Sequence, residues 1–143
     1  MIFKEVFDNK IFPEMKKEVE EKSIYNPTVT KAMPQQSKVF PIVPTKLLPI
    51  ERQYNNLSYG EETYTFGIEI NVYAMAKGNV SKRTICDEVT KCIIKYFEDN
   101  YHVKIKVDYD AINADSNVHR NIIKITGKLD TKYGLDNLVI YPN

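Results

Sequence analysis

The stretch from Thr63 to Tyr101 most limits how this chain can fold, because it predicts a long strand, a turn and one amphipathic helix in succession. In TYTFGIEINVYA, apolar side chains alternate with mostly polar ones, which is the period of a strand with one buried face. Such a strand would be about 40 Å long, so it is expected to bend at Gly67 or to extend past its neighbours. The residues on its predicted buried face are Tyr64, Phe66, Ile68, Ile70 and Val72.

Directly after this strand, MAKGN predicts a turn and Ser81 predicts the N-cap of a helix that extends over residues 81–100. The apolar residues of this helix recur at steps of three and four, which places them in one stripe. That stripe needs a sheet to cover, and the preceding strand supplies one. The residues of the stripe are Ile85, Val89, Cys92, Ile93, Tyr96 and Phe97.

The first 22 residues predict an amphipathic helix or a pair of short ones. Pro13 argues against one continuous helix, because proline has no N–H to donate and its ring clashes with the preceding turn. The apolar residues of this segment are Phe3, Val6, Phe7, Met15 and Val19.

Residues 23–60 contain Pro27, Pro34, Pro41, Pro44 and Pro49 but few periodic apolar side chains. Prolines in this number disfavour a helix interior or a central strand, so only VFPIV, at 39–43, is expected to form a short edge strand. The rest is expected to be an extended interaction arm with little regular structure until neighbouring subunits order it. Long loops in compact domains are usually functional, which first indicates an assembly protein.

After the helix, KIKVDYDAI and VHRNIIKITGKLD predict an antiparallel hairpin. The apolar cluster LVIY near the end predicts either a last strand or a segment that packs on a neighbour. The side chains expected to face inward from the hairpin are Ile105, Val107, Tyr109, Ala111, Ile123, Ile125 and Leu129.

These elements predict the α+β class, with one domain over residues 1–143 in which 23–60 form the arm. The expected architecture is a mostly antiparallel sheet of about four strands. One long helix and an N-terminal helix would pack on one face of it, with the proline-rich arm outside.

Charge and composition narrow the classes of function. The chain has 20 basic and 19 acidic residues, so a net charge of +1 provides no overall field for nucleic acid or an anionic membrane. No apolar run approaches the roughly 20 residues of a membrane span, and the charged segment after Met1 does not resemble a secretory signal. The chain is therefore expected to be made and used inside a cell.

The titratable residues give no catalytic or metal motif, so we expect no enzyme, no cofactor and no metal. Cys86 and Cys92 would project about 120° apart on the helix, which favours a reduced pair of small core residues. His102 and His119 have no companion at metal-ligand spacing. A third group, Asp108, Asp110 and Asp115, could serve a two-metal nuclease, but Lys104 and Lys106 on the same strand face favour a solvated face of mixed charge.

The long helix carries charges in the order that its dipole disfavours. Lys82 and Arg83 lie in its first turn, and Glu98 and Asp99 lie in its last. Either this order is chance surface placement, or it meets a partner. In the second case the basic start of one protomer would pair with the acidic end of the next around a ring, and these four residues would form a subunit interface.

The segments FGIEINVYA (66–74), KGNVSKRTICDEVTKCIIKYF (77–97), Tyr101-His102 and NVHRNIIKITGKLDT (117–131) resemble the tail terminator, or tail completion, family of bacteriophage neck proteins. The resemblance covers residues 62–132. It implies a structural, non-catalytic virion protein, assembled in the host bacterial cytoplasm. It also implies a ring, commonly hexameric, that caps the finished tail tube and offers the head–tail joining surface. The implied partners are the tail tube protein, neck and connector proteins and, in contractile tails, the sheath, with DNA passing through the ring unread.

Two other readings remain open. Another neck component, such as a head completion or connector protein, would have much the same sequence features. A nucleic-acid-binding or nuclease domain would use Lys104, Lys106 and Lys124. RNA-binding sheets place aromatic side chains among such basic residues, whereas Tyr109 and Phe66 are expected on buried faces here.

Overall fold

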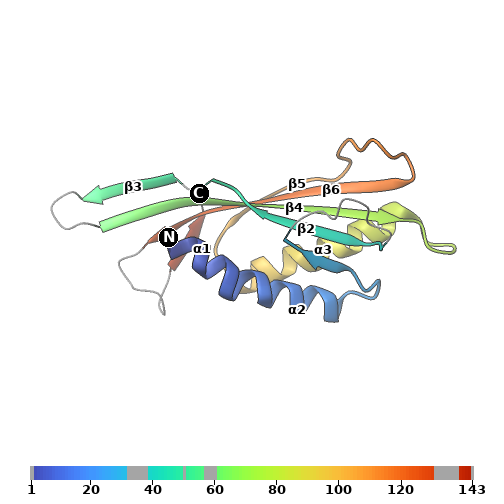
Figure 1. Ribbon diagram of the computed structural model, residues 1–143, viewed down its shortest axis with the longest axis horizontal. Coiled ribbons are helices and arrows are strands. Elements are labelled where there is room, and N and C mark those ends of the chain that lie inside the picture. Colours follow the sequence, from blue (N-terminus) through green and yellow to red (C-terminus); the bar gives the residue numbers. More distant parts are fainter. Residues whose placement is uncertain (1, 32–38, 50, 57–60, 131–138, 143) are drawn as a thin grey trace.

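The computed structural model describes residues 2–31, 39–49, 51–56, 61–130 and 139–142. They form two layers, a twisted sheet and helices packed against one of its faces, so the α+β class is confirmed (Figure 1). In chain order the elements are α1 (Ile2–Val6), η1 (Phe7–Ile11), α2 (Phe12–Lys22), β1 (Thr28–Thr30), β2 (Ile42–Leu47), β3 (Glu51–Asn56), β4 (Glu61–Met75), α3 (Lys82–Asn100), β5 (Lys104–Asp108), β6 (Val118–Asp130) and β7 (Val139–Pro142).

The N-terminal helix runs without a break through α1, η1 and α2, although Pro13 lies inside it. The segment η1 is a π-helix, and the N–H of Phe12 bonds to the carbonyl of Phe7, five residues back. This wider turn comes directly before Pro13, where an α-helical turn would press the proline ring against a carbonyl. The expected apolar residues Phe7, Met15 and Val19 are buried, so the amphipathic pattern is confirmed at these positions.

The sheet of the described residues has seven strands rather than about four. Its main order is β1-β2-β4-β6-β5, with β3 added beside β4 and β7 beside β6. All these pairs are antiparallel except β1 with β2, so the sheet is mixed. The expected hairpin of β5 and β6 is confirmed, while the additional strands come mainly from the segment expected to be an arm.

The expectation of little regular structure in residues 23–60 is wrong for most of its described part, because β1, β2 and β3 all lie there. The strand β2 is central rather than an edge strand, since β1 and β4 flank it. Its Pro44 stands opposite Thr30, the last residue of β1, so the missing N–H falls where that pairing ends. The expectation for 32–38, 50 and 57–60 lies outside the described residues.

β4 is the centre of the sheet, and it would measure about 50 Å from end to end. The expectation that it extends past its neighbours holds only for β2, which pairs with it from Ile68 onward; β3 pairs with its first part, and β6 pairs with it from Thr63 to Met75. Gly67 lies where the partner changes, and Leu48 N donates to its carbonyl at 2.8 Å. A Cβ on Gly67 would lie 3.0 Å from Leu48 Cδ1, so a larger residue would disturb this crossing.

α3 covers the sheet as the sequence predicts. Ser81 caps it by accepting a hydrogen bond from Thr84 N at 3.1 Å, and the preceding turn contains Gly78 at a positive φ of 58°. The strand and helix residues that form the core under it are Phe66, Ile68, Ile70, Val72, Ile85, Val89, Ile93, Tyr96, Phe97, Ile123 and Ile125. Tyr64 and Leu129 were also expected in the core, but their side chains lie outside the described part.

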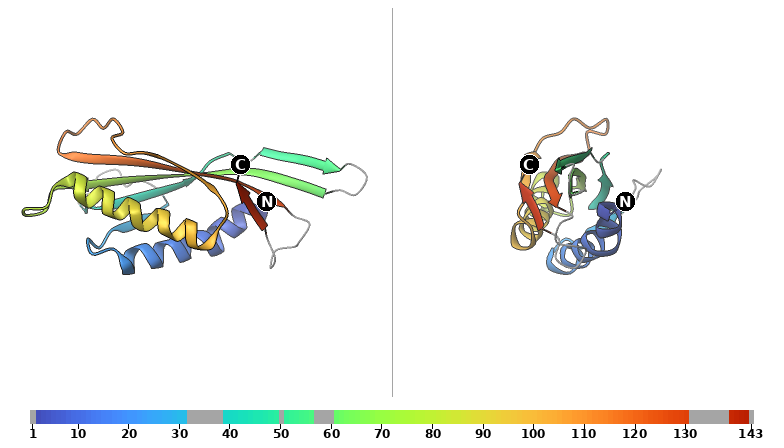
Figure 2. Two further views of the ribbon diagram at one scale, coloured as in Figure 1. Left: turned by 180° about the vertical axis from the view of Figure 1, so that it is seen from behind. Right: turned by 90° about the vertical axis from the view of Figure 1, so that its left-hand side faces the viewer.

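Among the residues that the structure describes, the helices cover part of the sheet and one of its faces. Seen end-on, the N-terminal helix and α3 lie side by side below the sheet, and the loop between β5 and β6 rises on the other side (Figure 2). β3 and the first part of β4 project beyond the helices (Figure 1). Near the other end of the chain, the LVIY cluster contributes to β7, which confirms a last strand there.

Candidate functional site

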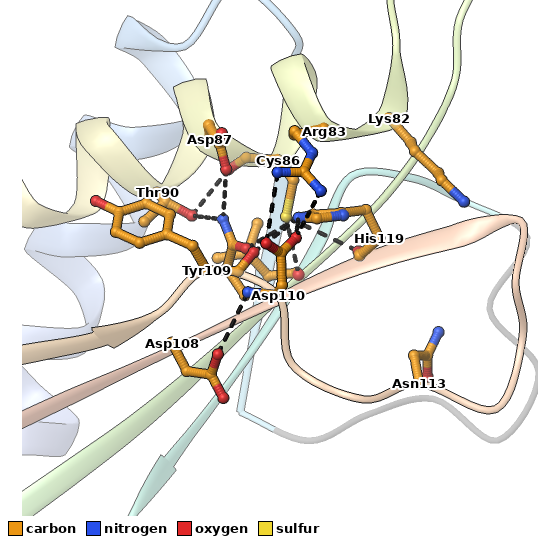
Figure 3. A network of polar contacts seen from close by, with 12 residues as sticks. Lys82, Arg83, Cys86, Asp87, Thr90, Asp108, Tyr109, Asp110, Asn113 and His119 are labelled. Atoms are coloured by element: carbon orange, nitrogen blue, oxygen red, sulfur yellow. Dashed lines mark hydrogen bonds and ion pairs between the residues drawn. The ribbon is translucent and has the colours of Figure 1, made fainter.

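The two basic residues singled out at the start of α3 both contact the loop between β5 and β6, residues 109–117, called the β5–β6 loop below. Lys82 Nζ donates to the carbonyl of Ser116. Arg83 Nη2 lies 3.0 Å from Asp110 Oδ1, and its Nη1 lies 3.4 Å from Oδ2, so guanidinium and carboxylate face each other as a fork (Figure 3). Both Lys82 and Arg83 therefore have partners within the same chain. These partners explain the basic charge at the start of α3 without a neighbouring subunit.

The acidic residues Glu98 and Asp99 lie exposed at the other end of α3. A helix of 19 residues is about 28 Å long, so the two charged ends cannot meet within one protomer. Asp99 does act on Lys22 of α2: the pKa of Lys22 is raised, mainly by its hydrogen bond to Glu18 and to a smaller extent by the charge of Asp99. The pairing of these two ends between subunits stays a prediction.

Beneath the first turns of α3 lies a buried polar network. Asn121 is fully buried in β6, and its Nδ2 donates to Asp87 Oδ1 at 2.9 Å and to Thr90 Oγ1 at 3.0 Å. Thr90 in turn donates to the carbonyl of Cys86 at 2.8 Å. Every polar group in this chain of contacts has a partner, so the network ties α3 to β6 in one relative position.

His119 extends the network to the β5–β6 loop. Its Nε2 lies 2.9 Å from the carbonyl of Tyr109 and 3.1 Å from Asn121 Oδ1, and Asp110 Oδ1 is 3.6 Å away. The carbonyl and the amide oxygen only accept, so Nε2 must carry a proton. This histidine therefore holds the loop to the sheet, and it belongs to the site although its sequence spacing did not single it out.

The cysteines match the expected pair of core thiols. Cys86 is buried and donates to the carbonyl of Val72 at 3.2 Å, and burial raises its pKa to about 12. Cys92 is half-buried and donates to Glu88 Oε1 at 3.2 Å; burial, with the adjacent Glu88, raises its pKa to about 11. Both thiols stay protonated near neutral pH, which makes them poor nucleophiles.

The three aspartates considered for a metal have other contacts. Asp110 faces Arg83, Asp108 accepts from the backbone of Asp110, and Asp115 accepts from the backbone of Asn117 at 2.9 Å. No group of three or more potential metal ligands occurs among the residues that the structure describes.

The sheet face away from the helices carries the predicted basic residues. Lys104, Lys106 and Lys124 are exposed there, and Lys106 stands directly opposite Lys124. Arg120, which was not among the predicted residues, also lies on this face: its guanidinium is 5.5 Å from the ring centre of Tyr73, and its Nε donates to Asn71 Oδ1 at 3.0 Å. Both Tyr73 and Arg120 could have been predicted on this face from the strand alternation. Their neighbours Val72 and Asn121 point inward, so these two side chains must point outward.

Of the two aromatic residues expected on buried faces, only Phe66 is buried. It is 2 % exposed, whereas Tyr109 is 49 % exposed. The strand β5 ends at Asp108, so Tyr109 belongs to the β5–β6 loop and no longer follows the strand alternation. Tyr73 therefore gives the open face an aromatic group that was not expected there, whereas the ring of Tyr109 lies toward α3, beside Thr90 (Figure 3).

Comparison of the chain with models of known protein families gave no match, and comparison with curated protein sequences gave none either. Within the described part of the chain, no helix is long and apolar enough to cross a membrane.

Proposed function

We propose that this protein is a structural subunit that works through surfaces rather than chemistry. The observation that carries the proposal is the one-sided covering of the sheet: in the described part of the chain, helices cover one face, and the other face and the projecting β3–β4 pair have no helix over them (Figure 2). A sheet of seven strands left open in this way offers a broad, rigid surface for other subunits.

The resemblance to phage tail terminator proteins supplies the role. In this role the protein forms a ring, commonly of six subunits, that caps the tail tube and presents the surface to which the head joins. Its partners are then the tail tube protein, the neck and connector proteins and the sheath of a contractile tail. Residues 23–60 act in the same proposal as an interaction segment, now with strands β1 to β3 as its framework.

The first experiment is the mass of the purified protein in solution, alone and with its tube protein, combined with negative-stain images of tail ends. A discrete closed oligomer that sits on the end of tubes is the expected result. A protein that stays monomeric with tubes present would contradict the proposal.

Gene deletion gives a second, independent test. Heads and tube subunits are expected to remain intact while tails fail to join, often with abnormal length. Normal tail length with failed joining would instead favour a head completion or connector protein. Normal, joined tails with failed DNA processing would favour an enzyme.

A nucleic-acid-binding surface is the second candidate, and the arrangement on the open face favours it. Arg120 and Tyr73 stack on the same sheet face as exposed Lys124, four residues farther along β6, and Lys106, which pairs with it, so this face combines basic and aromatic groups. Binding to single-stranded and duplex DNA should then weaken steeply with salt, and replacing Lys106 and Lys124 by alanine should reduce the salt slope. Absence of binding at low salt would exclude this candidate.

A further inference from the structure

The β5–β6 loop is unusually well held for a connection of nine residues. Besides Lys82, Arg83 and His119, Arg120 Nη1 donates to the carbonyl of Ile112 at 3.0 Å. Within the loop, Asn113 Nδ2 donates to the carbonyl of Asp115 at 3.2 Å. These bonds attach the loop to both β6 and α3, so its tip has a fixed position.

That tip is apolar. Ile112 is 91 % exposed, the largest exposure among the large hydrophobic residues described, and Tyr109 in the same loop is half exposed. Met75, which pairs with Val118 where β6 begins, is also exposed at this end of the sheet. A single exposed aliphatic side chain is ordinary, but Ile112 is held outward by a loop that Lys82, Arg83, His119 and Arg120 fix in place, which is the arrangement of a side chain that inserts into a pocket.

The opposite side of the molecule has a matching recess. Between α2 and α3 lies a groove of about 210 Å³, lined by Glu18, Lys22, Cys92 and Lys95. Ile24, 74 % exposed, follows Ser23, which donates to Glu88 at 2.7 Å and so joins the end of α2 to α3. An apolar cavity of about 150 Å³ holds a benzene ring, so this groove has room for one isoleucine side chain.

Charge favours the same match. Residues 109–117 contain Asp110 and Asp115 and no basic residue. On the groove side, Lys91 and Lys95 are exposed one turn apart on α3, and neither makes an ion pair with another described residue. Asp110 is paired with Arg83, and Glu18 in the groove is paired with Lys22, so among the described residues of these two surfaces the charges left unpaired are Asp115 on the loop and Lys91 and Lys95 at the groove. These opposite charges attract each other and set the orientation of the contact.

We propose that Ile112 of one subunit inserts into the α2–α3 groove of the next copy of this chain, with Asp115 near Lys95. The loop and the helices lie on opposite sides of the sheet (Figure 2), so the contact is heterologous and repeats from copy to copy. This contact adds to the proposed function the surfaces that join the subunits. It rests on that function only in one respect, the closure of the subunits into a ring.

The test is a disulfide trap between Ile112→Cys and the native Cys92, which lines the groove. The full-length variant is treated with a mild oxidant at pH 9, because the pKa of Cys92 is raised to about 11 by burial. Linked oligomers are expected on a non-reducing gel. They should disappear in Ile112→Cys with Cys92→Ser, and they should not form in Asn79→Cys, an exposed position in the turn before α3.

Self-association is measured in parallel for a loop variant without the trap. Ile112→Glu should weaken it at least about tenfold, because it removes the aliphatic group that the proposed contact buries. Ala114→Glu adds the same charge at an exposed position of the same loop without removing Ile112, and it should have a much smaller effect. Equal effects of the two variants would overturn the contact.

The outcomes separate this inference from the proposed function. A closed oligomer of discrete mass without Cys92-dependent linkage overturns the contact and leaves the proposed function standing. Cys92-dependent linkage in open series without a closed ring supports the contact and overturns the ring. A monomer under all conditions overturns both.

Discussion

Ile122 and Ile123 are neighbours in β6, yet they belong to different environments. Ile123 is fully buried under the helices, opposite Ile70, while Ile122 lies half-buried on the open face, opposite Asn71. The same two long strands thus have one face whose apolar side chains are packed under the helices and one whose side chains are only partly covered. Identical residues one position apart can therefore differ in how much they stabilise the fold, because strand side chains alternate between the two faces.

The two faces of the sheet also differ in the burial and bonding of their polar groups. On the helix face, the polar Asn121 and Thr90 are fully buried and bonded to each other. On the open face, Lys106 and Lys124 stand side by side without an ion pair to a described residue. A like-charge pair in water is tolerable but not stabilising, which is expected of a surface whose composition is free to serve a partner.

The largest loss of stability is expected from truncating the buried member of this pair of isoleucines. Ile123→Ala should lower the free energy of unfolding by about 2–5 kcal/mol, because it leaves a cavity in the core. Ile122→Ala, the matched control, should cost less than about 1 kcal/mol. Urea unfolding of the two variants measures both values. Similar losses would show that the open face is covered in solution.

A smaller loss is expected when the buried polar network is opened. Asn121→Ala removes the amide that donates to Asp87 and Thr90, so it should cost about 1–3 kcal/mol. Asn117→Ala, at an exposed position in the β5–β6 loop, should stay within about 0.5 kcal/mol. Thermal and chemical unfolding measure the loss of stability in both variants. If Asn121→Ala lost no more stability than Asn117→Ala, the network would not be holding α3 to β6.

The N-cap of α3 is expected to stabilise the helix that covers the sheet. Ser81→Ala should cost about 1 kcal/mol, because it leaves Thr84 N without its acceptor. Ser81→Asp keeps an acceptor and adds a favourable charge at the helix start, so it should retain most of the stability. Chemical unfolding distinguishes them; a loss in Ser81→Asp as large as in Ser81→Ala would rule out the cap.

The smallest change in stability is expected at the charged ends of α3, where the exposed pair of Arg83 and Asp110 should contribute no more than about 1 kcal/mol. Assembly should respond more strongly. Reversing Lys82 and Arg83 to glutamate should impair it, and the subunit pairing predicts rescue when Glu98 and Asp99 are also reversed to lysine.

The loop clamp predicts a different rescue. Arg83→Glu combined with Asp110→Arg should restore the fork within one chain and with it the assembly. Light scattering of both sets of variants decides between the two explanations. Rescue only by Glu98→Lys and Asp99→Lys would show that the clamp is not the reason these residues matter.

Most of the central unit could be predicted from local pattern. The alternation of Phe66, Ile68 and Ile70, the cap at Ser81 and the stripe of α3 all follow from spacing, and the structure confirms each. The hairpin of β5 and β6 also follows, since its strands are close in sequence.

Apart from the short strand expected at 39–43, which overlaps the start of β2, the strands of 23–60 could not be predicted, because they form through pairing with distant partners. β2 contains Pro44 and has a poor local signal, yet β4 provides a ladder that outweighs it. The π-turn before Pro13 likewise depends on packing that holds the helix continuous. Of the candidate site, the sequence located Lys82 and Arg83 but not their partners in the β5–β6 loop.

By itself, the sequence determined which residues alternate, which helix has an apolar stripe and where it begins, since these depend on periods of two and 3.6 residues and on a local cap. Only the tertiary structure decided that Arg83 meets Asp110, that Asn121 is satisfied inside the core and that Ile112 is held outward. These contacts join residues far apart in the chain. Their geometry exists only after the core has set α3 against the sheet, and no local spacing encodes it.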